Sequence, residues 1–327
     1  PRIVTGAQIE TLHGAALARF IRGANVFAEV TPDIKERIIA ALRHTGATVG
    51  YMGDGINDAP ALRAADIGIS VDNAVDAAKA AADVILLRQD LNVLLDGVLA
   101  GRTAFGNTIK YIAITISANF GNMISMAVAS LVLPFLPMLA TQILLNNLLS
   151  DLPMLAISTD RVDAETLERP RQWDFRALIR AMVGFGLMSS IFDGLTFLLL
   201  LVVFRADAAT FQTGWLVESL LTELCIVAVM RTHKSFFRSA PSALLLWTSA
   251  GVALVTVASC YLPYAKFFAF APLSPALMAS LLAIVVVYVA ASEVLKTRLG
   301  LIGPRSIPPA RGRARRALWW RRSRVRR

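Results

Sequence analysis

The distribution of apolar and polar residues divides the chain into two parts. In residues 1–100, short apolar runs alternate with segments of helical periodicity, and glycine or proline separates them. This pattern predicts strands at 25–30, 47–52, 67–71 and 83–87, and helices at 32–45, 59–65 and 75–82. Strands that alternate with helices are typical of a parallel sheet covered on both faces.

After residue 100, the pattern changes to long runs without charged residues. Tyr111–Ser150, Ser239–Ala265 and Phe267–Ser292 contain no Asp, Glu, Lys or Arg. These runs exceed the ~20 residues that cross a bilayer, and a soluble core does not need them. We therefore expect an all-α transmembrane domain at 101–296, with six helices at about 109–133, 138–158, 178–204, 214–230, 243–262 and 276–295.

Composition and loop charge support a multi-pass membrane protein. Apolar residues make up 56% of the chain and charged residues 17%, which excludes an ordinary soluble protein. One set of alternate loops contains Arg161, Arg169, Arg171, Arg176, Arg180, Arg231, Lys234 and Arg238, whereas the other contains Arg205 and Lys266. The positive-inside rule then predicts that the first set of loops and both termini are cytoplasmic.

The net charge of +10 comes from the C-terminal segment. Twelve Lys or Arg and no acid follow from Lys296 onward, and the rest of the chain is nearly neutral. We expect residues 297–327 to be a disordered cytoplasmic tail; contact with anionic lipid is the alternative, and no nucleic-acid partner is expected. Cys225 and Cys260 lie in apolar stretches and indicate neither a disulfide framework nor a metal cluster. No signal peptide is expected.

The turn after the second predicted strand carries the first candidate chemistry. Its sequence is GDGINDAPAL, in which Gly53 and Gly55 permit a tight turn close to a ligand. Asp54 and Asp58 place carboxylates at the carboxyl end of a strand, with Asn57 between them. Such oxygen ligands suit Mg²⁺ beside a phosphoryl group, and an Asp/Gly/Asn turn without a ligand is the alternative.

GDGINDAPAL resembles the hinge motif of P-type cation-transporting ATPases. Thr31-Pro32-Asp33-Ile34-Lys35 is similar to the T-P-x-x-K element of that family, whose lysine neutralises an aspartyl-phosphate. The resemblance implies that residues 1–100 are part of a phosphorylation domain with a haloacid-dehalogenase-like, Rossmann-like parallel sheet. It implies catalytic roles for Lys35, Asp54, Asn57 and Asp58, a catalytic Mg²⁺ at Asp54 and Asp58, and cofactor contacts at Gly53 and Gly55.

Two segments in the first two expected spans resemble the cation-site helices of the same family. They are SANFGN, ending at Asn122, and NNLLSDLP, ending at Pro153. A carboxyl group inside a span is functional by default, and Pro153 frees backbone carbonyls for a cation. The predicted ligands of the transported cation are Asn119, Asn122, Asn147, Ser150 and Asp151. The alternative is that these polar residues only bond one helix to another.

The resemblance is closer still to bacterial magnesium-translocating P-type ATPases. FGN at 120–122, PRQWD at 170–174, SSIFDGLTF at 189–197 and FQTGW at 211–215 are similar to that branch. Calcium pumps of the family carry glutamate where Asn122 stands, so less negative charge surrounds the cation here, which suits Mg²⁺. The roles of Asp193, Glu218 and Glu223 stay open. The sequence thus predicts the C-terminal part of an ATP-driven Mg²⁺ pump of the bacterial plasma membrane.

Several parts of such a pump have no counterpart in this sequence. Nothing resembles the D-K-T-G-T segment that accepts the phosphate, the T-G-E-S element or the nucleotide-binding domain. The chain alone is therefore expected not to hydrolyse ATP, and its expected partner is the ATP-binding N-terminal half. The alternatives are a non-catalytic membrane subunit, half of a split protein, or a pump for another divalent cation or for lipid. A soluble-type phosphatase on a membrane anchor would need its own D-x-D-x-T nucleophile, which is absent.

Overall fold

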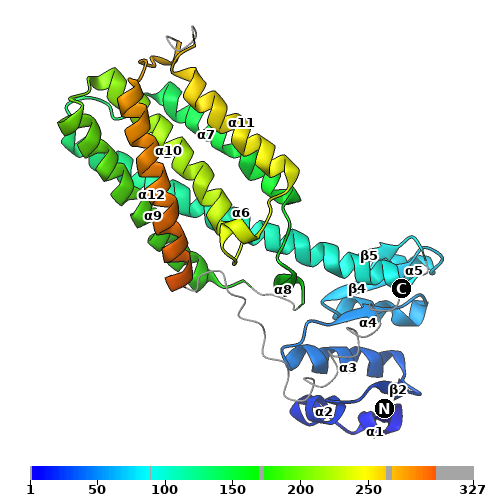
Figure 1. Cartoon of the computed structure of the whole chain (residues 1–327). Helices are drawn as coiled ribbons and strands as arrows, with labels where there is room; N and C mark the ends of the chain where they lie inside the picture. Colours follow the sequence, from blue (N-terminus) through cyan, green and yellow to red (C-terminus); the bar gives the residue numbers. More distant parts are fainter. Residues whose placement is uncertain (1, 89, 169–172, 263–266, 300–327) are drawn as a thin grey trace. The chain divides into compact units, whose positions relative to one another are not determined.

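The computed structural model describes residues 2–88, 90–168, 173–262 and 267–299 (Figure 1). Residues up to Val98 form one compact unit, and a second unit begins at Leu99. Several sequence predictions lie outside the described residues: the tail from 300 onward, Arg169, Arg171 and Lys266.

Five short strands occur in the described part of the first unit, and all their pairings are parallel. They are β1 (Ile3–Thr5), β2 (Val26–Ala28), β3 (Gly50–Met52), β4 (Ile67–Val71) and β5 (Val84–Leu86). The predicted parallel direction is confirmed. However, the strands form two sheets, β1–β2 and β3–β4–β5, where one sheet was expected. No described strand joins the two sheets by hydrogen bonds. Strand β1 was not predicted, because three residues give no periodic signal.

The helices of this unit have their expected order, and the two before β2 were not predicted. They are α1 (Gly6–Glu10), α2 (Gly14–Ile21), α3 (Pro32–His44), α4 (Ala59–Ala64) and α5 (Asp76–Ala81). Helix α3 begins at Pro32 because the first turn of a helix needs no N–H donor there. Its buried residues Ile34, Ile38 and Ala41 recur on one face and join a core with α1 and α2.

The strands of the first unit are only partly covered. Ile67, Val84 and Ile85 are exposed apolar residues within β4 and β5. Gly68, Ile69 and Ser70 of the central strand β4 are buried, and successive residues of a strand point to opposite faces, so the prediction of two covered faces agrees with β4 and fails only at its start and on the edge strand β5. The unit therefore presents apolar strand surface outside its own core.

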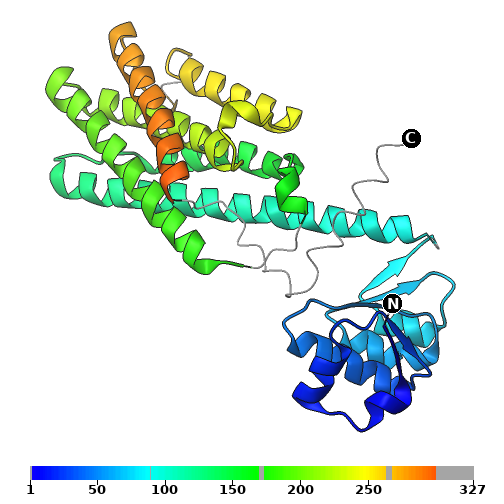
Figure 2. The same cartoon turned by 60° about the horizontal axis from the view of Figure 1, so that its bottom comes forward.

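The second unit is helical. Its helices are α6 (Leu91–Val132, which begins in the first unit), α7 (Ala140–Ala156), α8 (Ala164–Leu167), α9 (Phe175–Leu198), α10 (Ala208–Met230), α11 (Ala243–Ser259) and α12 (Pro275–Leu299). Helices thus occur at all six predicted spans, and α6 is one unbroken helix in the cyan to green part of Figure 2. Four of them, α6, α9 with its π-helical continuation, α10 and α12, are long and apolar enough to cross a membrane. Helices α7 and α11 are shorter, with 17 residues each.

Helix α10 lies at the centre of the helical unit. It packs against α7, α9, α11 and α12 (Figure 1). Its buried residues, among them Trp215, Leu216 and Leu220, point to all sides of the helix. A helix that is apolar around its whole circumference belongs in the core of a bundle.

Helices α6 and α9 touch through two glycines. A Cβ atom on Gly186 would lie 2.6 Å from Cδ1 of Phe120, and one on Gly121 would lie 3.0 Å from the carbonyl oxygen of Gly186. The hydroxyl of Ser190 donates to the carbonyl of Gly121 at 3.1 Å. Small residues and interhelical hydrogen bonds are the usual means by which helices associate in membranes.

A buried ion cluster ties four segments of the helical unit together. The carboxylate of Asp160, after α7, accepts from Nζ of Lys110 on α6 at 2.8 Å and from Nη1 of Arg231 at the end of α10 at 3.0 Å. It also accepts from the backbone N–H of Ser242, which precedes α11, at 3.2 Å. The Asp160 side chain is fully buried. These donors compensate the negative charge of the buried carboxylate. Lys110 and Arg231 in turn need that charge, because both cations are buried beside it.

We expect Asp160→Asn to lower the free energy of unfolding by about 3–5 kcal/mol, because it leaves two buried cations without their counter-charge. Thermal unfolding of the protein in detergent measures this loss. Glu165→Gln is the matched control, since Glu165 pairs with Lys234 on the exposed surface and its loss should not move the transition. Equal stability of both variants would contradict the prediction.

Candidate functional site

The T-P-x-x-K and GDGINDAPAL motifs meet at the end of β3. Nζ of Lys35, from α3, lies 2.7 Å from Oδ1 of Asp58, across 23 positions of sequence. The same oxygen accepts from the hydroxyl of Tyr51 at 2.7 Å, and Oδ2 accepts from the N–H of Gly55 at 3.3 Å. The fold thus brings together the lysine and one of the two carboxylates that the sequence singled out.

The local backbone explains why Asp58 sits there. The N–H of Gly53 extends the ladder to Ile69 of β4 at 3.0 Å, and the Ser70 hydroxyl donates to the Gly53 carbonyl at 2.9 Å. The chain then turns through a 3₁₀ segment that ends at Asp58. A Cβ atom on Gly53 would lie 2.5 Å from Cβ of Asp58, so only glycine leaves room for this carboxylate.

Neighbouring groups stabilise the charged form of Asp58. Partial burial by itself raises the pKa of this carboxyl, but hydrogen bonds from Lys35, Tyr51 and Gly55, together with the lysine charge, hold the pKa below its usual value. Burial, then the hydrogen bond and negative charge of Asp58, and finally the charge of Asp54, raise the pKa of the Tyr51 phenol. Because the pKa of Asp58 is depressed, its contribution to stability is present above the unfolded pKa and is lost as the pH falls through the folded value.

The other predicted residues of this turn are open to solvent. Asp54 and Asn57 are exposed, and the backbone carbonyl of Asp54 accepts from the N–H of Val75 at 3.1 Å. The two carboxylates of the turn differ in how readily they could bind Mg²⁺. Asp54 offers an exposed carboxylate, whereas three of the roughly four lone-pair positions of Asp58 are already used.

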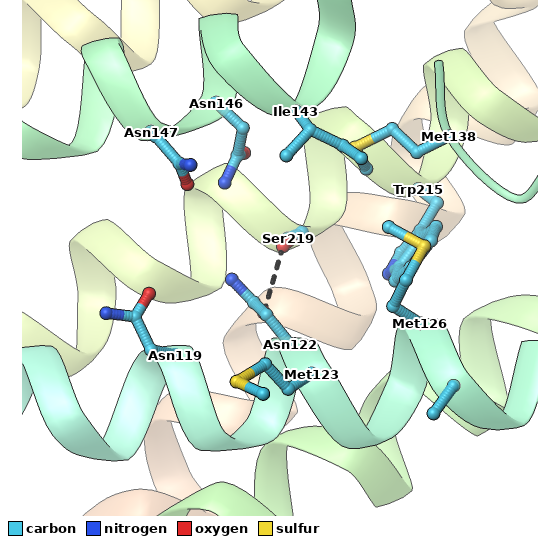
Figure 3. A pocket seen from close by; sticks show the side chains of 11 residues that line it. Asn119, Asn122, Met123, Met126, Met138, Ile143, Asn146, Asn147, Trp215 and Ser219 are labelled. Atoms are coloured by element: carbon cyan, nitrogen blue, oxygen red, sulfur yellow. Dashed lines mark hydrogen bonds between the residues drawn. The ribbon is translucent and has the colours of Figure 1, made fainter. Parts of the chain in front are cut away.

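A second group of polar residues lines a pocket of about 430 Å³ between α6, α7 and α10. In Figure 3, Asn119 and Asn122 of α6 face Asn146 and Asn147 of α7, and Ser219 of α10 lies between them. Oγ of Ser219 donates to Oδ1 of Asn122 at 3.4 Å. The remaining lining residues are apolar: Met123, Met126, Ala127, Met138, Ile143 and Trp215.

Asn146 gives this pocket an oxygen suited to a cation. Its Nδ2 donates to Oε2 of Glu223 at 3.4 Å. Its Oδ1 is buried and has no hydrogen-bond partner among the described residues. An amide oxygen without a donor is a ready ligand for a hard cation. Glu223 also lies within hydrogen-bonding range of Ser150. A carboxyl group of α10 thus contacts α7 beside Asn146.

The structure separates the predicted cation ligands into two groups. Asn119, Asn122 and Asn147 line the pocket, but Ser150 and Asp151 are not among its lining residues. Ser150 is buried and donates to the carbonyl of Asn147 at 3.2 Å, whereas Asp151 is exposed. Helix α7 continues through Pro153 to Ala156. Since proline has no N–H, the α-helical bond to the carbonyl four residues before Pro153 is missing.

Sequence reasoning missed some of the contacts in both sites. Nothing in the sequence indicated the hydrogen bond from Tyr51 to Asp58, because a tyrosine is common in an apolar strand whether or not it makes such a bond. Asn146 was part of the NNLLSDLP segment but was not selected, although its buried oxygen is the strongest ligand feature on α7. Asn122 and Asn146 do bond to α10, as the alternative of helix-to-helix bonds expects, and these bonds do not decide whether they also bind a cation. Asn119 and Asn147 are exposed on their helices.

Two families match separate parts of the chain. Residues 135–298 match the family described as cation transporting ATPase, C-terminus. Residues 2–66 match the haloacid dehalogenase-like hydrolases, in agreement with the small parallel sheets.

Curated relatives point the same way. The chain is 46% identical to "Magnesium-transporting ATPase, P-type 1" of Escherichia coli K12 over 90% of its own length and 33% of that protein. It is 46% identical to the Salmonella typhimurium LT2 protein of the same name over 84% of the chain and 30% of the relative. A "Calcium-transporting ATPase 1" of Bacillus cereus is 34% identical over 65% of the chain and 24% of the relative. The chain thus spans about a third of the magnesium-transporting relatives and corresponds to their C-terminal part. It belongs to the P-type cation-transporting ATPases.

Proposed function

We propose that this chain is the C-terminal part of an ATP-driven pump that moves Mg²⁺ across the bacterial plasma membrane through an aspartyl-phosphate. The observation that carries the proposal is the ion pair of Lys35 and Asp58 at the end of β3. It fixes an ammonium group at the edge of a parallel sheet, where α/β folds bind their ligands. A lysine held there neutralises the charge of a transferring phosphoryl group.

In this proposal, each residue of the turn has a separate task. Asp58 holds Lys35 in position, with Tyr51 fixing the same carboxylate from the strand. Asp54 and Asp58 would hold the catalytic Mg²⁺, Asp54 with its exposed carboxylate and Asp58 with its remaining lone pair. When bound, Mg²⁺ offsets the negative charge of the phosphoryl oxygens. Asn57 is exposed on the same turn, where it and the backbone of Gly53 and Gly55 would contact the phosphoryl group.

The pocket between α6, α7 and α10 would receive the transported cation. Mg²⁺ loses its waters reluctantly, and six waters at ~30 Å³ each need roughly 180 Å³, which the pocket of about 430 Å³ exceeds. Amide oxygens of Asn119, Asn122, Asn146 and Asn147 can bind such a hydrated ion without excess charge. Asp151 would supply negative charge for attraction, and Glu223 places a second carboxyl group beside Asn146. Ser150 and Asp151 would become ligands in states of the pump in which α7 turns these residues toward the pocket.

The remainder of the pump would complete both sites. Asn119, Asn147 and Asp151 are exposed on α6 and α7, and polar groups at this depth of a membrane require cover by protein or water rather than lipid. The exposed strand residues of the first unit call for cover in the same way. We therefore propose that the N-terminal portion supplies this cover, the phosphate-accepting aspartate and the ATP site. The Arg-rich loops, both termini and the first unit would be cytoplasmic.

The absence of a side chain at Gly53 leaves the room that Asp58 occupies. In the complete pump, Gly53→Ala should lower the level of phosphoenzyme formed from radiolabelled ATP by about a hundredfold, because it pushes Asp58 off Lys35. Gly50→Ala is the matched control, since a Cβ there meets its nearest atoms at 3.9 Å and the variant should form phosphoenzyme normally. Normal phosphorylation of the Gly53 variant would rule out this role for Asp58.

Asp151 is the acid of the second expected span, and we assign it to the transported cation. Asp151→Asn should abolish cation-stimulated ATP hydrolysis in the complete pump, because the site loses its nearby charge. The control is Asp96→Asn, which changes an exposed acid outside the charge-free run and should leave turnover intact. Comparing Mg²⁺, Ca²⁺ and Mn²⁺ as stimulating ions identifies the cargo, and preference for another ion would refute the Mg²⁺ assignment.

The size of the native product tests whether the chain belongs to a longer pump. An antibody against the loop between α7 and α9 should detect a membrane protein about three times the 35.3 kDa of this chain, as expected from its 33% share of a relative. A product of 35.3 kDa that copurifies with no ATP-binding protein would contradict the proposed function.

A further inference from the structure

Two acids outside the proposed cation pocket face each other in the middle of the helical unit. Asp193 on α9 is 2% exposed, and Glu218 on α10 is 1% exposed. Their carboxyl groups lie within hydrogen-bonding range of each other. Two buried carboxylates in contact cannot both stay ionised unless positive charge compensates them.

The buried bases in the described part of the chain do not compensate this pair. They are Lys110, Arg231 and Lys296. The first two bind Asp160, and Lys296 binds Glu293 and the carbonyls of Val229 and Lys234. The titratable side chain that α12 turns toward the pair is Tyr288, which is itself an acid. A proton is therefore the charge that remains available to the pair.

The hydrogen bonds distinguish the two acids. The indole N–H of Trp215 donates to Oδ1 of Asp193 at 2.7 Å, and the hydroxyl of Ser125, from α6, donates to Oδ2 at 2.6 Å. Both donors stabilise negative charge on Asp193, because charge-assisted bonds of this length are strong. Asp193 is thus built as an acceptor on both of its oxygens.

Glu218 has the opposite surroundings. It faces Asp193, and no group in the described part of the chain donates a hydrogen bond to its buried Oε2. An isolated charged oxygen in this position would be very costly, whereas an isolated neutral carbonyl oxygen is tolerated. The geometry suits a protonated acid that donates its O–H to Asp193 and leaves its carbonyl oxygen free.

We propose that Asp193 and Glu218 form a proton-binding site, in which Glu218 holds the proton and donates it in a hydrogen bond to an ionised Asp193. The pair then carries one negative charge, shared with the donors Trp215 and Ser125. The site joins α9 and α10 directly and reaches α6 through Ser125. Trp215 also lines the neighbouring pocket, so one side chain belongs to both sites. Neither the pair nor its proton depends on which cation the protein transports.

Infrared spectroscopy of the purified native protein tests this assignment. A protonated carboxylic acid has a C=O stretch that is separate from carboxylate and amide bands. At neutral pH, Glu218→Gln should remove one such band, because glutamine keeps the hydrogen-bond donor but not the acid. Asp193→Asn should keep the band at a shifted frequency, since Glu218 stays buried and loses its charged acceptor. Glu165→Gln, which changes an exposed carboxylate, should leave the acid bands as they are.

Each other result overturns the proposal. Loss of the band in Asp193→Asn, with retention in Glu218→Gln, would place the proton on Asp193. The same number of acid bands in all proteins would mean that the pair is fully ionised and holds a cation. If a variant does not fold, ¹³C-carboxyl labelling of glutamate in the unaltered protein replaces it. A buried acid band that labelled glutamate fails to shift would then refute a proton on Glu218.

Discussion

Polar groups of α6 that lipid cannot satisfy find partners within the protein, either on the helix's own carbonyls, as Ser117 does with Ala113, or on other segments. This constraint organises the helical unit. Lys110 finds Asp160, Asn122 finds Ser219, and Ser125 finds Asp193. These bonds lie at successive levels along α6, and two of the three lead to α9 or α10. The chain thus fixes α6 against its centre by polar bonds as well as by apolar packing, and the bond of Asn122 to Ser219 lies within the lining of the proposed cation pocket.

The first unit applies the same logic to one carboxylate in a more open setting. Asp58 accepts from a helix, a strand and a turn, and so joins α3, β3 and the GDGINDAPAL loop at one point. In the helical unit, Asp160 does this with two cations and Asp193 with neutral donors and an acid. The partners decide the outcome: an ion pair at Asp58 and Asp160, and a shared proton at Asp193 by our proposal.

The sequence predicts elements better than the contacts between them. Apolar runs locate the helices because span length and charge-free composition are local properties, and Pro32 marks the start of α3. The division into two sheets was not predictable, since strand pairing depends on backbone bonds between distant segments. Likewise, the motifs select Lys35 and Asp58, and the structure brings them together. The same motifs give no reason to separate Asp151, which is exposed, from the asparagines that line the pocket. Whether Asp193 and Glu218 face each other depends on the orientation of α9 and α10 about their axes, and the composition of the two helices does not determine it.

The close contact of Gly121 with Gly186 would make this level of α6 the pivot of any tilt against α9. Backbones that touch leave no side-chain layer to deform, so a tilt of α6 against α9 turns about this point. At 1.5 Å per residue, Asn119 lies about 3 Å from the pivot and Leu99 about 33 Å. A tilt that moves Leu99 by several ångströms therefore moves Asn119 roughly a tenth as far. Small adjustments of the pocket amides would correspond to large displacements at the other end of the helix.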